Sequence, residues 1–156
     1  MKIMDFLCER AISLNLRSTE KKNAIEELVE LLIKGGELKE SDKQEIMEIL
    51  LNRESLGSTG IGQGIGIPHG KSCRVNKLVA AFGISKKGIN FDALDGEPVY
   101  IFFLILAPEE FAGPHLKALA SISRLLKDKY FRDSLLGVEN ENNIVKIIKD
   151  EDQKRA

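Results

Sequence analysis

Residues 57–72 read GSTGIGQGIGIPHGKS and place His69, one of the two histidines of the chain, among six glycines. Glycine frees the backbone to turn sharply and to approach a ligand closely. Pro68 fixes the backbone directly before the imidazole. An imidazole in this setting can act as a nucleophile, an acid–base group or a metal ligand. These roles require different neighbours, so the surrounding residues discriminate among them.

A nucleotide-binding loop is one alternative, because Gly70-Lys71-Ser72 resembles the end of the phosphate-binding pattern G-x-x-x-x-G-K-[ST]. That pattern requires a glycine where the chain has Ile65, and Pro68 removes an N–H group that would bind phosphate. The dinucleotide pattern G-x-G-x-x-G also fails, because from Gly60, Gly62 or Gly64 the third glycine position holds Ile65, Ile67 or His69. The sequence therefore disfavours a bound nucleotide.

A metal site is the second alternative, with His69, Cys73 and His115 as candidate ligands. A histidine and a cysteine four residues apart share a metal only when both lie on one face of a helix. Pro68 and Gly70 oppose a helix at this point. We therefore expect neither a metal nor another cofactor.

A phosphorylated histidine is the third alternative. An imidazole with an ordinary pKa of about 6.5 is mostly neutral near pH 7 and can attack a phosphoryl group. Transfer of that group depends mainly on positioning and on charge stabilisation. The chain offers five candidate phosphate-binding groups: the Arg53 guanidinium, the hydroxyls of Ser58 and Thr59, the backbone N–H of Gly70, and a helix start at His115.

The elements before the glycine-rich run are a strand over residues 11–16 and two helices. Ser18 or Thr19 is expected to cap the first helix, and the glycines at 35–36 to end it. Ser41 and Gln44 form a capping-box pattern for the second helix, which ends near residues 53–54. This order places Arg53 at a helix end, directly before the glycine-rich run.

The elements after that run are strands over residues 78–84 and 99–106 and a helix that follows Gly113-Pro114. Proline is tolerated at a helix start, so His115 is expected in the first turn. The helix is predicted to bury the stripe Leu116, Leu119, Ala120, Ser123 and Leu126. Two weaker helices follow at 130–136 and 143–150, and residues 150–155 read as a frayed tail. The second strand is apolar on both faces, which predicts an α/β (α+β) fold with a mixed sheet flanked by helices on both sides.

Composition narrows the class of protein. A chain of 156 residues, with 43% hydrophobic and 30% charged residues, fits a single domain over 1–156. A net charge of −1 gives no attraction to nucleic acid or to an anionic membrane. The longest apolar run, residues 99–107, is too short for a membrane-spanning helix. Two cysteines far apart and no secretory signal favour a reduced, cytoplasmic location.

The run from Arg53 to Lys71, with GSTGIG at 57–62 and IPHGK at 67–71, is similar to the signature of phosphotransferase-system enzyme IIA domains. The class is the fructose/mannitol/nitrogen-regulatory one (type 2). DGEPV at 95–99, LAP at 106–108 and His115-Leu116 extend the resemblance, which covers roughly residues 5–150. One departure is Gly66, where the family usually has alanine. It removes no functional group.

The resemblance implies a phosphotransferase component that takes no free small molecule as substrate. His69 would accept a phosphoryl group from a histidine-containing phosphocarrier protein, at the Nε2 atom. His115 and Arg53 would stabilise the group, together with the hydroxyls of Ser58 and Thr59. The group would then pass to a IIB domain for sugar uptake, or its presence would control a regulatory target. The phrase LGSTGIG at 56–62 resembles the nitrogen-regulatory branch more closely.

Overall fold

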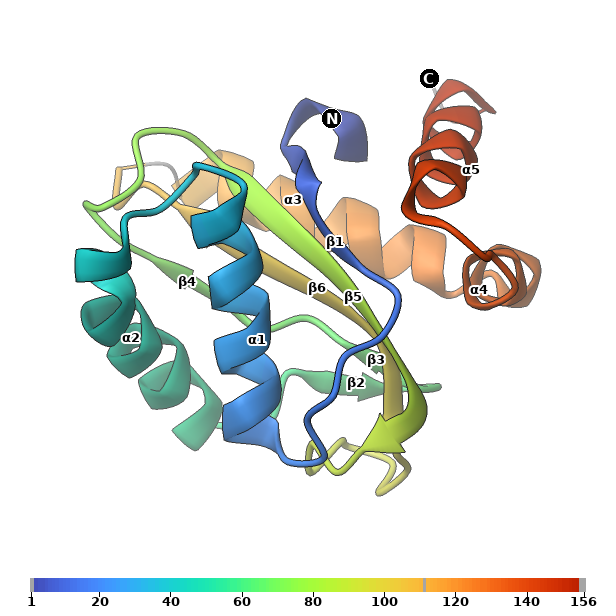
Figure 1. Ribbon diagram of the computed structural model, residues 1–156, viewed down its shortest axis with the longest axis horizontal. Coiled ribbons are helices and arrows are strands. Elements are labelled where there is room, and N and C mark those ends of the chain that lie inside the picture. Colours follow the sequence, from blue (N-terminus) through green and yellow to red (C-terminus); the bar gives the residue numbers. More distant parts are fainter. Residues whose placement is uncertain (1, 111, 155–156) are drawn as a thin grey trace.

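The computed structural model describes residues 2–110 and 112–154, and a six-stranded mixed sheet forms its centre (Figure 1). β5 (Val79–Ile89) and β6 (Val99–Ala107) are the long strands and pair antiparallel. β1 (Leu7–Ser13) pairs parallel with β5. On the other side, β6 pairs parallel with β3 (Ile65–Gly66) and with β4 (His69–Lys71), and β2 (Gly60–Gly62) pairs antiparallel with β3. The glycine-rich run thus adds strands along β6.

Helices cover both faces of the sheet, as the sequence predicts. α1 (Lys21–Lys34) and α2 (Lys43–Ser55) lie in front of it in Figure 1, and α3 (Ala112–Leu126) lies behind. α4 (Lys129–Leu136) and α5 (Glu141–Lys154) pack on the α3 side. Along β6, alternate side chains enter two separate cores, with Phe103 in the core under α3 and Phe102 in the core under α1 and α2. A strand covered on both faces is apolar throughout for this reason.

The predicted helix starts are wrong in detail. Glu20 is the N-cap of α1 and its side chain makes no capping bond, while the Ser18 hydroxyl donates to the carboxylate of Glu27. α2 begins after a short 3-10 helix, η2 (Glu40–Asp42), which contains Ser41, so the predicted capping box is absent there. The predicted end of α1 is confirmed, with Gly35 as C-cap and Gly36 at φ 84°.

The buried face of α3 also differs from the predicted stripe. Leu116 is 65% exposed, whereas Ala118 and Ile122 are fully buried beside Leu125 and Leu126. The helix is turned by about one position relative to the prediction, because His115 is buried and takes the place expected for Leu116. Its first turn still contains His115, as predicted.

Residues 150–154 form the end of α5, contrary to the prediction of a frayed tail over 150–155, and Arg155 lies outside the described residues. α5 extends to Lys154, and Asp152 is buried at 7% exposure. Its carboxylate accepts the backbone N–H groups of Ile3 (3.0 Å) and Met4 (3.0 Å), in the short helix η1 (Ile3–Asp5). The two ends of the described chain are thereby joined.

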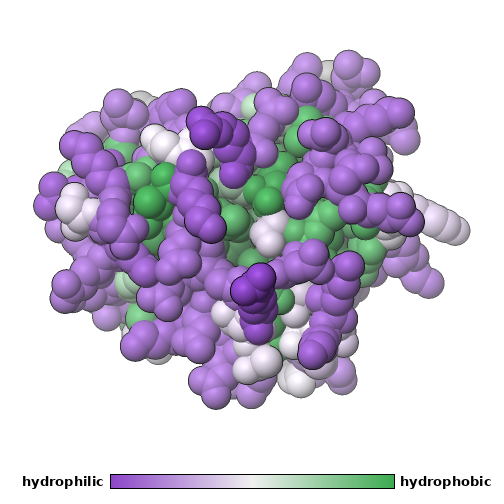
Figure 2. All heavy atoms as spheres, in the orientation of Figure 1, coloured by the Kyte–Doolittle hydropathy of each residue, from purple (hydrophilic) through white to green (hydrophobic). Residues whose placement is uncertain are grey.

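The outer surface is mostly polar. Figure 2 shows hydrophilic residues over most of the face seen in Figure 1, with hydrophobic residues visible mainly toward the middle of the view, where the strands lie. Among the helices of the described residues, none has the length and apolar character needed to cross a membrane.

Candidate functional site

The glycine-rich run folds into a hairpin followed by an edge strand. Gln63 (φ 58°) and Gly64 (φ 79°) form the two-residue turn between β2 and β3, and positive φ at both central positions is the geometry of a type I′ turn. The chain then follows β6 until His69 lies opposite Ile105. Glycines that suggested a phosphate-binding loop therefore serve, in part, to build this hairpin.

Other glycines in the run have no space for a side chain. A Cβ on Gly70 would lie 2.8 Å from Cγ2 of Ile49 in α2, and a Cβ on Gly66 would lie 3.1 Å from the Phe102 ring. Gly70 thus allows α2 to approach β4 closely. This packing explains why a glycine is needed at position 70. The predicted binding of phosphate by the Gly70 N–H stays a prediction.

The imidazole of His69 has a fixed orientation. Its Nδ1 lies 2.8 Å from the carbonyl oxygen of Ile67, so Nδ1 carries the proton and donates it. The lone pair is then on Nε2. Burial lowers the pKa of His69 below its ordinary value; the Ile67 bond and the charge of Glu54 oppose this shift, and the charge of Arg53 adds to it. The imidazole of His69 is therefore neutral near pH 7.

His115 lies beside His69, although 46 positions separate the two in sequence. Their ring centroids are 5.3 Å apart and the rings are tilted by 54°. His115 is 4% exposed, and its buried Nδ1 has no hydrogen-bond partner within the described residues. Burial lowers the pKa of His115 to about 4, with further lowering by the charges of His69 and Lys71. The predicted pair is thus brought together in the fold.

Lys71 belongs to the same surroundings, although the sequence analysis left it out of the site. Its positive charge reaches His115, and it ends β4, the strand that begins with His69. Because successive strand residues alternate faces, His69 and Lys71 share one face of β4. That spacing of two in a strand is the signal that would have placed Lys71 in the site.

Arg53 and Ser58 lie at the junction between α2 and the hairpin. Nη1 of Arg53, in the last turn of α2, donates to the carbonyl oxygen of Gly57 (2.8 Å). The Ser58 hydroxyl donates to the Phe91 carbonyl (2.8 Å) and accepts the N–H of Gly60 (3.0 Å). The charge of Arg53 reaches His69, so α2 supplies a cation to the imidazole as expected.

Thr59 is bonded to a residue that the sequence analysis did not assign. Its backbone N–H donates to both carboxylate oxygens of Glu54 (3.2 and 3.0 Å), and its hydroxyl donates to the same carboxylate. Glu54 is 7% exposed and lies in the last turn of α2. A carboxylate at a helix C-terminus opposes the helix dipole, and this mismatch is the sequence signal that marks Glu54.

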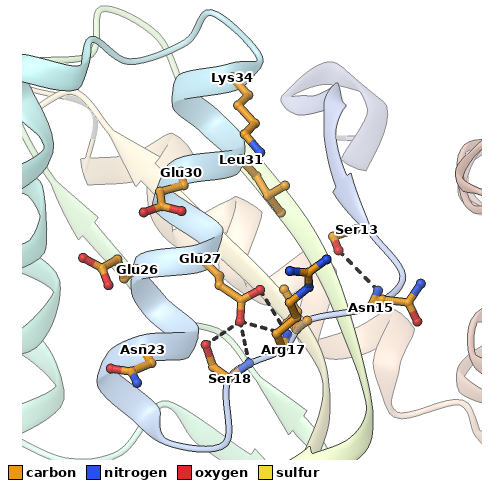
Figure 3. A pocket seen from close by; sticks show the side chains of 11 residues that line it. Ser13, Asn15, Arg17, Ser18, Asn23, Glu26, Glu27, Glu30, Leu31 and Lys34 are labelled. Atoms are coloured by element: carbon orange, nitrogen blue, oxygen red, sulfur yellow. Dashed lines mark hydrogen bonds between the residues drawn. The ribbon is translucent and has the colours of Figure 1, made fainter.

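The structure of the described residues also bears on the metal-site alternative and contains a large groove apart from the histidines. Within the described residues, no three His, Cys, Asp or Glu side chains are grouped so that they could hold a metal ion. A groove of about 780 Å³ lies between β1 and α1, and Figure 3 shows Glu27 accepting bonds there from Arg17 and Ser18. It lies toward the β1 edge of the sheet, away from β4. None of the predicted site residues lines it.

Comparison with known proteins shows the family of the chain. The model of the family "Phosphoenolpyruvate-dependent sugar phosphotransferase system, EIIA 2" matches residues 5–151. The chain is 44% identical over 153 residues to the fructose-specific EIIABC component of Bacillus subtilis, covering 98% of this chain but only 24% of that relative. It is 42% identical over 129 residues to the nitrogen regulatory protein of Bradyrhizobium diazoefficiens, covering 83% of this chain and 82% of the relative.

A solved structure gives the same result for the fold. The nitrogen regulatory protein IIA-Ntr of Neisseria meningitidis superposes with a TM-score of 0.84 at 35% sequence identity, over 94% of this chain and 98% of that one. The family model spans the hairpin, His69 and His115. The chain therefore belongs to the EIIA 2 family of the phosphoenolpyruvate-dependent sugar phosphotransferase system.

Proposed function

We propose that this chain is a phosphocarrier that accepts a phosphoryl group on Nε2 of His69. The observation that carries the proposal is the hydrogen bond from Nδ1 of His69 to the Ile67 carbonyl, which leaves the Nε2 lone pair free. The lowered pKa of His69 keeps that lone pair unprotonated near pH 7. The donor is a phosphorylated histidine of a carrier protein.

The transfer exchanges one phosphorus–nitrogen bond for another. The Nε2 lone pair attacks the phosphorus, and the bond between phosphorus and the donor imidazole breaks, returning its electron pair to the donor. His69 keeps its Nδ1 proton, which the Ile67 carbonyl continues to accept. This carbonyl stabilises the positive charge that develops on the ring, because hydrogen bonds to charged groups are the stronger ones.

Two cations act on the imidazole pair and could stabilise a phosphoryl group there. The charge of Arg53 reaches His69, and the charge of Lys71 reaches His115. His115, neutral because of its pKa of about 4, can donate an N–H to a phosphoryl oxygen. The hydroxyls of Ser58 and Thr59 and the N–H of Gly70 are assigned a supporting role, and the two hydroxyls would have to leave Phe91 and Glu54 to fill it.

A protein substrate fits the apolar surroundings of the site. Among the described residues, four of the six exposed large hydrophobic side chains adjoin segments that form it: Leu56 (84% exposed), Leu94 (74%), Leu116 (65%) and Ile61 (40%). Leu94 is held there by its N–H, which donates to the Gly60 carbonyl (2.9 Å). Exposed apolar side chains in one region are typical of surfaces that bind other proteins. The partners would be the carrier and either a IIB domain or a regulatory target, in the cytoplasm.

The nitrogen-regulatory role is the one we assign first. The structural match to IIA-Ntr, with a TM-score of 0.84 at 35% sequence identity, supports this role. The 44% identity to a fructose-specific EIIABC component supports a second candidate, donation to a IIB domain during sugar uptake. Measured phosphoryl transfer to a fructose-type IIB domain would separate the two.

Labelling with phosphoenolpyruvate tests the shared proposal. With enzyme I and the carrier protein present, acid-labile label is expected on the wild type and is expected to disappear in His69→Gln. ³¹P–¹⁵N correlation spectra should place the phosphorus on Nε2. Circular dichroism of the variant controls for folding. Label that remains on His69→Gln would contradict the proposal.

A further inference from the structure

Glu54 is a charged side chain in an unfavourable place. It is 7% exposed and lies in the last turn of α2, where the helix dipole disfavours a negative charge. A buried carboxylate is costly unless it is paired and hydrogen-bonded. Its presence therefore needs a compensating set of contacts.

Those contacts come from two other segments of the chain. Nζ of Lys21, at the start of α1, lies 3.5 Å from Oε2 of Glu54 and 5.0 Å from the centroid of the Phe91 ring. Thr59 donates both its N–H and its hydroxyl to the carboxylate. Since these donors satisfy both oxygens, three hydrogen bonds tie Thr59 to the carboxylate.

Thr59 is in turn bonded to the segment that holds the imidazole. Its carbonyl oxygen accepts the N–H of Ile67 (3.0 Å), and the Ile67 carbonyl accepts Nδ1–H of His69 (2.8 Å). A series of hydrogen bonds thus runs from the Glu54 carboxylate through Thr59 and Ile67 to Nδ1 of His69, the nitrogen whose proton defines the tautomer. Every member of this series is part of the described structure.

We propose that Glu54 is a positioning residue for His69: it fixes Thr59, and through Thr59 the Ile67 carbonyl that keeps the His69 proton on Nδ1 and directs Nε2 outward. The inference rests on the proposed phosphorylation of His69. Glu54 touches neither the phosphoryl group nor the donor, so its effect on transfer is indirect.

Glu54→Gln is the direct test, because it keeps the shape and removes the charge and one acceptor. Phosphorylation of His69 is expected to slow about tenfold, the order of loss for a small misplacement of the nucleophile. The share of the Nδ1–H tautomer should fall, as read from ¹⁵N shifts of the unphosphorylated ring. The pKa of His69 should also fall, because the Glu54 charge and the Ile67 bond both raise it.

Three further variants complete the test. Glu48→Gln changes an exposed glutamate of the same helix and should leave tautomer, pKa and rate unchanged. Thr59→Val removes the hydroxyl but keeps the backbone N–H, so it should shift the tautomer less than Glu54→Gln does. Thr59→Ser keeps the hydroxyl and should restore the wild-type tautomer. If Glu54→Gln does not fold, the Thr59 pair carries the test.

The outcomes separate a positioning role of Glu54 from a purely structural role and from failure of the proposed function. Wild-type tautomer, pKa and rate in Glu54→Gln would overturn the inference. A loss of stability without a change at the His69 ring would also overturn it, since that is the result for a purely structural glutamate. If wild-type His69 takes no phosphoryl group, the proposed function fails, but the tautomer and pKa of the unphosphorylated ring still report on Glu54 separately.

Discussion

At the scale of single residues, the two imidazoles are held neutral by different surroundings. His69 is half-buried and bonded to Ile67, whereas His115 is almost fully buried and its Nδ1 has no partner within the described residues. Two neutral rings can lie 5.3 Å apart without repulsion. A phosphoryl group on His69 would add a strong negative charge and raise the pKa of His115.

Stability should depend on pH through His115. Its pKa is about 4 in the folded chain and 6.5 in the unfolded chain, so the unfolded state binds the additional proton between these values. This contribution to the free energy of unfolding is complete above pH 6.5 and decreases as the pH falls to about 4. One proton gives at most about 1.4 kcal/mol per pH unit.

Denaturant titrations of wild type and His115→Gln between pH 7 and pH 4 check this dependence. The difference in unfolding free energy between the two proteins should shrink as the pH falls. His69→Gln retains the buried His115 and serves as the comparison. A difference that stays constant over the window would contradict the assignment.

Residue types and spacing could nominate His69, whereas the roles expected for His115 and Arg53 rested on the resemblance to the enzyme IIA family. The partnership of Glu54 with Thr59 could not be predicted in the same way. It depends on the chain reversing after α2 so that Thr59 turns back onto the last helical turn. Local patterns describe periodicity within an element, and this contact lies between elements.

At the scale of elements, close approach between α2 and β4 brings Arg53 and Glu54 to His69. Gly70→Ala should disturb this approach, because the added Cβ would lie 2.8 Å from Ile49 Cγ2 and 3.5 Å from Leu50 Cδ2. Overpacking of this kind costs about 1–3 kcal/mol of unfolding free energy. Urea unfolding measures it, and the phosphorylation rate should fall in parallel.

Gly113→Ala is the matched control for that prediction. Nothing lies within 4 Å of a Cβ at Gly113, which is in a helix, so alanine there should be neutral or stabilise slightly. Equal destabilisation by the two substitutions would show that contact with α2 is not the cause.

The positions of the strands could be predicted from local hydrophobic patterns. The buried face of a helix could not, because packing against the sheet decides it. The strands near 78–84 and 99–106 are confirmed, with β5 extended to Ile89. The buried face of α3 was predicted only in part: Leu126 is buried as predicted, but a histidine scores as polar and Leu116 as apolar, whereas His115 faces inward beside His69. The sequence of α3 contains two adjacent apolar stripes, one that includes Leu116 and one that follows His115, and packing against the sheet buries the second.

At the scale of the whole molecule, two cores on opposite faces of one sheet join distant parts of the chain. The core under α3 contains Ile3 near one end and Ile148 near the other. Asp152 strengthens this closure by accepting two N–H groups from η1. The ends therefore contribute to the stability of the sheet that carries His69.

Asp152→Asn should destabilise the protein. The amide keeps one acceptor and directs its NH₂ at a backbone N–H, which leaves a buried donor unsatisfied at a cost of about 1–3 kcal/mol. Asp150→Asn changes an exposed residue of the same helix and should have little effect. Thermal and urea unfolding of both variants make the comparison; similar losses in the two would contradict it.

The closure of that core has a consequence for synthesis on the ribosome. β1 pairs with β5, which begins 66 positions after β1 ends. The face of β1 that lies in the core under α3 is covered only after α3 and α5 have been synthesised. A nascent chain that contains only α1, α2 and the hairpin lacks the sheet on which all three pack. Native contacts around His69 thus form late, in a transition dominated by long-range pairing, which folds more slowly than local helical structure.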